Sequence, residues 1–291
     1  MMKRREFLGT SAAALFASEL SWAMPMDHKI KAVGLQLYTV RNAMKTDVDG
    51  TVTKVAQVGY QEMEFAGYFD HSPKDIRALL DKNGLTSPST HVGYDIVEKK
   101  WAEQIEISHT IGHQYIVCPW IDEKQRSADG MKRAADLFQK AGEESAKAGI
   151  QFAYHNHTFE FQKLAGLEGK VPYDLILATD PKYVKLELDL CWASVAGQDP
   201  VDLFEKHPGR FPLVHVKDMK QLPKGEEAAT ASPDQVMPNM TEVGGGVIDF
   251  KRIFAHSEKA GIQHYFVEHD FPKDPWESIN KSYTYLHNLT F

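Results

Sequence analysis

The sequence predicts an α/β fold in which eight strands and eight helices alternate and close into a (β/α)8 TIM barrel. A helical stretch ends at a glycine, and a strand follows within one or two residues, at Gly59, Gly84, Gly112, Gly149 and Gly261. Glycine adopts the left-handed conformation just past a helix without steric cost, so each site indicates a helix-to-strand junction. Repeated alternation of this kind is typical of a mostly parallel sheet. Eight such units in 291 residues also suit a TIM barrel, which usually takes about 250 residues.

The expected strands are short runs of apolar and β-branched residues. They cover residues 32–40, 61–66, 86–92, 114–119, 151–156, 184–190, 212–217 and 264–269. Helical stretches lie between them near 48–58, 73–83, 96–111, 129–148, 173–179, 200–207, 249–260 and 274–288. An open, doubly wound sheet is the alternative, but it normally carries a glycine-rich phosphate turn after its first strand. Here the first strand continues into residues 38–41 (YTVR), which favours the closed barrel.

Residues 219–243 interrupt this alternation. The stretch is rich in Pro, Ala, Glu and Met, shows no clear periodicity and is long for a loop between a strand and a helix. On a barrel it would follow the seventh strand, at the face where TIM barrels carry their active sites. A lid, a partner-contacting arm and a disordered insertion all fit this pattern. With no internal repeat in the sequence, residues 24–291 are expected to form a single domain.

The first 23 residues have the three parts of an export signal. The pair Arg4-Arg5 precedes a mildly apolar run at residues 10–17, and residues 21–23 (SWA) offer small side chains at a cleavage site. The arginine pair predicts a twin-arginine signal, and therefore export to the periplasm or another exported location. A Sec-type signal and a plain basic terminus are the alternatives.

Composition excludes some classes of partner. Hydrophobic residues make up 43% of the chain and form no long uninterrupted stretch, which predicts a soluble protein with no membrane contact after signal removal. The formal charge of -7 disfavours a nucleic-acid partner, because DNA binding depends on Lys and Arg side chains that neutralise phosphates. Cys118 and Cys191 lack the spacing of a metal site and are expected to be small buried residues rather than a disulfide pair.

Four consecutive strands end in side chains that bind divalent cations. In TIM barrels these strand ends meet at the rim that carries the catalytic groups. Imidazole nitrogen and carboxylate oxygen together suit Mn, Fe, Co or Zn, with Mg also compatible. The strand ends therefore predict one divalent metal ion with the ligands His155, Asp189, His215 and Glu268.

Other polar and aromatic residues near this rim are expected to contact a substrate. Lys217 lies two residues after His215, so the two side chains share one face of the strand. For each of the others, a structural role such as a loop cap or a packed ring is the alternative. The predicted substrate contacts are Glu64, His91, His157, Glu160 and Trp192.

Several motifs spread over the chain after residue 23 point to one family. They are residues 34–38 (GLQLY), 154–157 (YHNH), 188–192 (LDLCW), 214–218 (VHVKD) and 244–250 (GGGVIDF). On these motifs the chain resembles the xylose isomerase-like TIM barrels, the sugar phosphate isomerase/epimerase group that also includes D-tagatose 3-epimerase, inosose dehydratase and endonuclease IV. The resemblance implies metal ligands Glu, Asp, His and Glu on strands five to eight, and Asp189, His215 and Glu268 match the last three. His155 stands where the family usually has the first glutamate, and Trp192 where an epimerase often has His.

The resemblance implies proton abstraction beside a carbonyl, through an enediolate that the metal stabilises. The expected function is a metal-dependent isomerase or epimerase of a small-molecule sugar or sugar derivative, with His155, Glu268 and Lys217 as catalytic groups. Because His155 replaces a carboxylate that shuttles the proton in epimerases, a lyase or dehydratase acting on a keto-sugar or keto-glycoside is the alternative. A non-catalytic sugar-binding barrel is a further alternative, while the charge and the export signal disfavour an endonuclease. Assembly into a homo-oligomer stays open.

Overall fold

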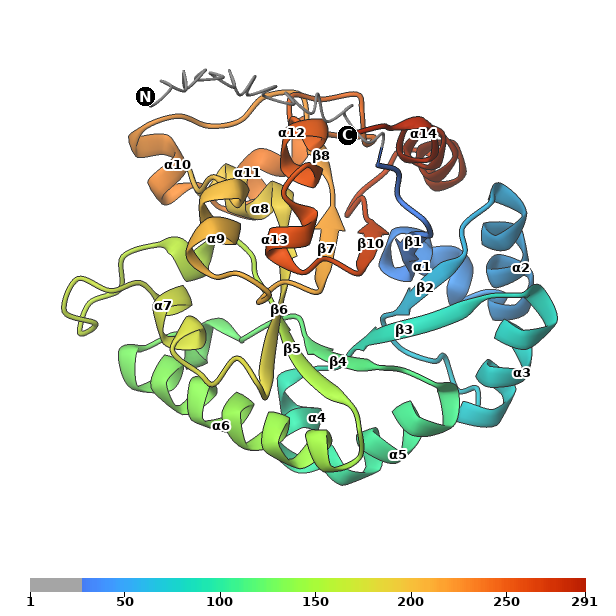
Figure 1. Cartoon of the computed structure of the whole chain (residues 1–291), viewed down its shortest axis with the longest axis horizontal. Helices are drawn as coiled ribbons and strands as arrows, with labels where there is room; N and C mark the ends of the chain where they lie inside the picture. Colours follow the sequence, from blue (N-terminus) through green and yellow to red (C-terminus); the bar gives the residue numbers. More distant parts are fainter. Residues whose placement is uncertain (1–27) are drawn as a thin grey trace, which may run out of the picture.

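A computed structural model describes residues 28–291 and shows a closed barrel of parallel strands inside a ring of helices (Figure 1). The strands follow one another around the barrel in chain order, and β1 closes it against β10. Their bounds are β1 (Val33–Gln36), β2 (Glu62–Phe65), β3 (Thr86–His91), β4 (Tyr115–Cys118), β5 (Gln151–His155), β6 (Val184–Asp189), β7 (Leu213–Val216) and β10 (His264–Val267). The predicted TIM-barrel fold is therefore confirmed.

The predicted twin-arginine signal falls at residues 1–23, outside the described residues, and stays a prediction. Among residues 28–291, no helix combines the length and the apolar character needed to cross a membrane. Cys118 and Cys191 are both buried and free, as expected.

Most helices that surround the strands agree with the predicted stretches in position, but two of these are divided, and α1 and α8 are short helices that were not predicted. The predicted helix 96–111 is broken at Lys100, and the predicted helix 249–260 forms two short helices on either side of His256. The bounds are α1 (Arg41–Met44), α2 (Val48–Val58), α3 (Pro73–Asn83), α4 (Tyr94–Lys99), α5 (Trp101–Ile111), α6 (Ala128–Lys147), α7 (Pro172–Leu177), α8 (Leu190–Val195), α9 (Pro200–Lys206), α12 (Phe250–Phe254), α13 (Ser257–Ala260) and α14 (Pro275–Asn288).

The first strand is shorter than predicted. It ends at Gln36, and Leu37–Val40 form a 3-10 turn in place of the strand expected to reach residue 40. The side-chain oxygen of Gln36 accepts a hydrogen bond from the backbone N–H of Tyr38 at 3.0 Å, which caps the turn. Such side-chain caps compete with strand pairing in a way that an apolar sequence pattern does not reveal.

The interior of the barrel has an apolar layer beneath a polar layer. Because side chains alternate along a strand, every second residue points into the barrel. The apolar layer consists of Tyr115, Val117, Ala153, Leu213 and Phe266. Two residues further along β5, β7 and the end of β10 come His155, His215 and Glu268. The polar groups of the site therefore rest on a packed apolar floor.

Residues 219–243 are not a structureless loop. They contain α10 (Glu226–Thr230), α11 (Pro233–Val236) and the turn Met237–Asn239, and β8 (Asp218–Met219) pairs with β9 (Met240–Thr241). The carboxylate of Asp218 accepts hydrogen bonds from the backbone N–H groups of Gly244, Gly246 and Ile248 at 3.0, 2.9 and 3.2 Å. These bonds tie the end of the segment to β8 and explain why glycines stand there, since a Cβ at Gly246 would lie 2.3 Å from Asp218 Oδ1.

Gly34→Ala should destabilise the apolar layer. A Cβ at position 34 would lie 2.5 Å from Phe266 Cδ1, so the phenyl ring has to move. We expect a loss of about 1–3 kcal/mol in the free energy of unfolding, measured by denaturant titration. Adding Phe266→Leu should recover part of that loss, and an unchanged midpoint in the single variant would contradict the tight contact.

Candidate active site

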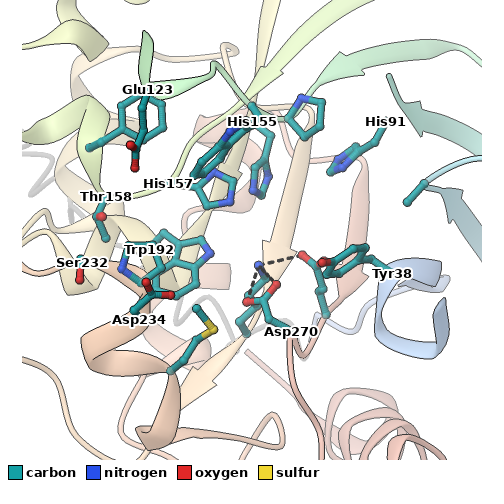
Figure 2. Close-up of a pocket in the computed structure, with 18 of the residues that line it drawn as sticks. Tyr38, His91, Glu123, His155, His157, Thr158, Trp192, Ser232, Asp234 and Asp270 are labelled. Atoms are coloured by element: carbon teal, nitrogen blue, oxygen red, sulfur yellow. Dashed lines mark hydrogen bonds and ion pairs between the residues drawn. The ribbon is translucent and has the colours of Figure 1, made fainter. Parts of the chain in front are cut away.

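A pocket of about 860 Å³ opens at the ends of the strands, within the size range of ligand-binding sites. Figure 2 shows His91, His155 and His157 along one side of it and Asp270 facing them, with Trp192 near Ser232 and Asp234. The last two come from the 219–243 segment, which therefore forms part of the pocket wall. Aromatic rings at the pocket lining include the exposed side chains of Tyr38, Trp120 and Phe271.

Lys217 is the central cation of the pocket floor. Its Nζ lies 2.8 Å from Glu268 Oε2, 3.1 Å from Asp189 Oδ2 and 3.2 Å from both carboxylate oxygens of Asp270. Burial opposes a charge on this side chain, but Asp189, Asp270 and Glu268 outweigh it and hold the pKa of Lys217 well above its usual value. The lysine is therefore a fixed ammonium that lines the pocket.

A cluster of three imidazoles surrounds one carboxylate oxygen beside this lysine. Oε2 of Glu187 lies 2.7 Å from His91 Nε2, 3.2 Å from His215 Nε2 and 3.3 Å from His155 Nδ1. We call His91, His155, Glu187 and His215 the inner set. The pairing of β5 with β6 places His155 directly beside Glu187, and β7 brings His215 beside Asp189 on the other side.

A second group of possible metal ligands shares one histidine with the inner set. Asp189, His215 and Glu268 have ligand atoms within 4.8 Å of one another, and we call them the outer set. His215 Nδ1 lies 2.7 Å from Glu268 Oε2, so its two ring nitrogens face the two sets. The four predicted metal ligands are thus divided, because His155 lies in the inner set and the other three form the outer set.

The charges of the carboxylates decide which imidazoles are protonated. Burial opposes a charge on His91, but Glu64 and Glu187 outweigh it and raise the pKa of His91 to about 9. Glu187, Glu268 and Glu64 likewise outweigh burial and hold the pKa of His215 well above its usual value. Burial and the neighbouring charge of His215 lower the pKa of His155, which is therefore neutral.

Glu64 lies behind the pocket rather than at its surface, although the sequence predicts it as a substrate contact. Its side chain is fully buried, and it accepts hydrogen bonds from Gln36 Nε2 at 2.7 Å and from the Ser89 hydroxyl. Its Oε2 lies 2.6 Å from His215 Nε2. The reason is register, because Gln36, Glu64 and Ser89 are neighbours on β1, β2 and β3 and all point into the barrel.

Glu160, also predicted as a substrate contact, lies behind the pocket lining. Its carboxylate accepts hydrogen bonds from the Tyr154 hydroxyl at 2.6 Å and the His157 backbone N–H at 2.9 Å, and the side chain is fully buried. It holds the loop after β5 in place. Burial outweighs these hydrogen bonds and raises the pKa of Glu160 to about 7.

Six of the other predicted site residues reach the pocket, whereas Asp189 and His215 lie beneath its lining. The residues from that prediction that line it are His91, His155, His157, Trp192, Lys217 and Glu268. Sequence reasoning did not assign a role to Asp270, although its position two residues after Glu268 is the signal that it shares the same face. Nor did it place Glu187 among the imidazoles, although Glu187 shares a face of its strand with Asp189.

The donor atoms of both sets fit a divalent metal ion. Among the described residues, His155 Nδ1 and Glu187 Oε1 are buried without a hydrogen-bond partner, while Asp189 Oδ2 has only its ion pair with Lys217. Buried polar atoms without partners are costly, and a cation would satisfy them. Imidazole nitrogens with carboxylate oxygens suit Zn, Mn, Fe or Co.

Comparison with known proteins finds relatives with this architecture. The profile of the xylose isomerase-like TIM barrel family matches residues 52–287. An inosose dehydratase from Lacticaseibacillus casei is 24% identical over 266 residues, which cover 81% of this chain and 87% of the relative. A sugar phosphate isomerase/epimerase from Parabacteroides distasonis ATCC 8503 has a similar crystal structure, with a TM-score of 0.70, 27% identity, and coverage of 93% of this chain and 97% of that chain. The IolI protein with a binding zinc atom shares the fold at 14% identity, with a TM-score of 0.67 and coverage of 87% and 95%.

Glu160→Gln should remove a pH dependence of stability. The pKa of Glu160 rises from 4.5 to about 7 on folding, so the folded protein binds this proton more tightly than the unfolded chain. The stabilisation is fully present below pH 4.5 and is lost as the pH rises through about 7, by about 3 kcal/mol in total. Urea unfolding at about pH 5 and about pH 8 measures it as the difference between parent and variant. The exposed Glu144→Gln is the control, and equal pH profiles for the parent and Glu160→Gln would contradict the assignment.

Proposed function

The chain belongs to the xylose isomerase-like TIM barrel family, and on that premise we propose that it is a metal-dependent lyase that removes water from a polyhydroxylated ketone. The observation that carries this proposal is the difference between the two sides of the pocket. Lys217 forms ion pairs with Glu268 and Asp270, and Figure 2 shows Asp270 on one side of the pocket with His155 and His157 on the other. The inosose dehydratases among the relatives support the same reaction class.

An elimination needs this kind of asymmetry. Epimerisation exchanges a proton between two faces of one carbon and is served by a carboxylate on each face, but here the end of β5 presents His155. Elimination needs a base for the proton beside the carbonyl and a separate group near the leaving hydroxyl. The carboxylates and the imidazoles supply these two different groups from opposite sides.

We assign Asp270 as the base, because Glu268 is engaged by both His215 and Lys217 while Asp270 contacts Lys217 and lines the pocket. The C–H bond beside the carbonyl breaks and its proton passes to Asp270, while the ammonium of Lys217 donates a hydrogen bond to the carbonyl oxygen as negative charge develops there. The electron pair then forms a double bond as the C–O bond of the neighbouring hydroxyl breaks. That hydroxyl takes up the proton that Asp270 has received and leaves as water, which restores the Asp270 carboxylate, so no oxidant or reductant is needed.

A divalent metal ion, when bound, would polarise the carbonyl as a Lewis acid. The inner and outer sets are the groups that would hold it, and they share His215. Glu268 positions the reacting groups by contacting both His215 Nδ1 and Lys217 Nζ.

The charge of the pocket favours a neutral substrate over a sugar phosphate. Its lining contains the carboxylates of Glu123, Asp234, Glu268 and Asp270 against the cations Lys217 and Arg126, and Lys217 is already paired with three carboxylates. A phosphate would add negative charge to this surface. We also propose export through the twin-arginine signal of residues 1–23, which agrees with an unphosphorylated keto-sugar or keto-glycoside.

An isomerase or epimerase is the second candidate. The similarity to the sugar phosphate isomerase/epimerase from Parabacteroides distasonis, at 27% identity over nearly the whole chain, favours it. Both reactions begin with removal of the same proton, so the two candidates differ only in the later steps.

Product mass separates the candidates. The metal-loaded full chain is incubated with an inosose, with keto-sugars and with keto-glycosides, and the products are measured by mass spectrometry. We expect loss of one water, or of the attached alcohol from a keto-glycoside. A product of unchanged mass would favour the isomerase or epimerase, and no product from any ketone would contradict both and favour a sugar-binding barrel.

Asp270→Asn should slow the elimination about 100- to 10,000-fold, because general-base catalysis typically contributes that much. Initial rates on the ketone that the parent converts give the comparison. Asp234→Asn is the matched control, because Asp234 lines the same pocket without contacting Lys217 among the described ion pairs. A rate within about tenfold of the parent for Asp270→Asn would place the base elsewhere.

A further inference from the structure

We infer that the metal ion of this site is held by the inner set, His91, His155, Glu187 and His215, and that Lys217 takes the place of a metal in the outer set. This inference deepens the proposed function, because it names the ligands of the metal on which that function depends. It departs from the arrangement implied by the sequence motifs, in which Asp189 and Glu268 bind the metal directly.

The spacing of the inner set matches a single metal centre. Two ligand atoms at 2.0–2.1 Å from a tetrahedral ion lie about 3.3 Å apart. Glu187 Oε2 lies 2.7, 3.2 and 3.3 Å from the nearest nitrogens of His91, His215 and His155. The ring centre of His91 lies 5.3 Å from the ring centre of His155 and 5.2 Å from that of His215, so the three imidazoles converge on one region.

Two of these imidazoles have a carboxylate at the ring nitrogen that faces away from the set. His215 Nδ1 lies 2.7 Å from Glu268 Oε2, and His155 Nε2 lies 3.8 Å from Asp189 Oδ2. A carboxylate in this position orients a metal-bound histidine and increases its basicity. Glu268 therefore has a coherent role as the hydrogen-bonded partner of the ligand His215, while Asp189 lies beyond hydrogen-bond distance of His155 and acts on it only through its charge.

The outer set is already occupied by an ammonium. Lys217 Nζ lies 2.8 Å from Glu268 Oε2 and 3.1 Å from Asp189 Oδ2, which are two of the three ligand groups of that set. A divalent cation between the same oxygens would meet strong repulsion from the lysine at this distance. None of the described ion pairs joins Lys217 to Glu187 or His91, so the inner set is free of that competitor.

Atoms without partners point to the same place. His155 Nδ1 and Glu187 Oε1 have no hydrogen-bond partner among the described residues, and their side chains are only 2% and 0% exposed. Both atoms belong to the inner set. Three nitrogens and one carboxylate favour Zn, Mn, Fe or Co over Mg and Ca, which prefer oxygen ligands. His91 and His155 also line the pocket, so an ion held there is within reach of the substrate.

The sharpest test compares two buried carboxylates on one strand. Glu187 and Asp189 are both fully buried on β6, and Glu187→Gln and Asp189→Asn make the same change from carboxylate to amide. The full chain is stripped with a chelator and titrated with Co²⁺ alone, and the visible absorption of the ion and the metal content after dialysis are measured. We expect about one equivalent in the parent, a loss of affinity of more than about 100-fold in Glu187→Gln, and a loss of about 10- to 100-fold at most in Asp189→Asn.

Two further variants keep the test decisive if Glu187→Gln fails to fold, which its melting curve without metal would reveal. His91→Gln alters a residue that belongs only to the inner set and should weaken Co²⁺ binding more than about 100-fold. If the inner set binds the ion, Lys217→Met should change the Co²⁺ affinity less than about tenfold. If the outer set binds it, removing the ammonium should increase the affinity much more, because the charge repulsion at that set is lost.

The ligand assignment is overturned if Asp189→Asn loses the ion while Glu187→Gln or His91→Gln keeps it, or if the parent binds no Co²⁺. Failure of the proposed function looks different. In that case the parent and variants follow the expected binding pattern, but no polyhydroxylated ketone is converted.

Discussion

The pairing of buried carboxylates with buried cations is the interaction on which the site depends. Glu64, Glu187, Asp189 and Glu268 lie inside the barrel, where an unpaired charge is very costly. Each of them faces Lys217 or an imidazole. The apolar layer below excludes water from this network, so its charges interact strongly and hold one another in fixed positions.

This network explains how one rim serves binding and chemistry together. His215 contacts Glu64 and Glu187 through one ring nitrogen and Glu268 through the other, and so links the imidazole cluster to the lysine. The lysine in turn contacts Asp270 at the pocket wall. A change of charge at the imidazole cluster therefore alters the electrostatic environment of Lys217 and Asp270, the groups proposed to act on the substrate, about two side chains away.

The eight strands were predictable because their signals are local. Glycines just past the helices adopt the left-handed conformation at Gly59, Gly84, Gly112 and Gly261, and the β-branched runs follow directly. The early end of β1 was missed because the Gln36 side chain caps the following turn, which an apolar pattern does not reveal, and the breaks in the two divided helices carry no side-chain cap that the sequence could have signalled. The short helices of residues 219–243 carry too little periodicity to be recognised, although α11 lines the pocket.

By itself, the sequence determined that polar, metal-binding side chains stand at the ends of consecutive strands, because the period of two along a strand decides which residues share a face. Only the tertiary structure decided how deeply each of these side chains is buried and which groups it contacts. Register between strands set Glu64 against Gln36 and Ser89 and brought Glu187 among the imidazoles, while hydrogen bonds from Tyr154 and the His157 backbone N–H hold Glu160 behind the pocket wall. The burial of each side chain depends on how the strands pair and close into a barrel. Closure brings together residues more than a hundred positions apart in the sequence, such as Glu64 and His215.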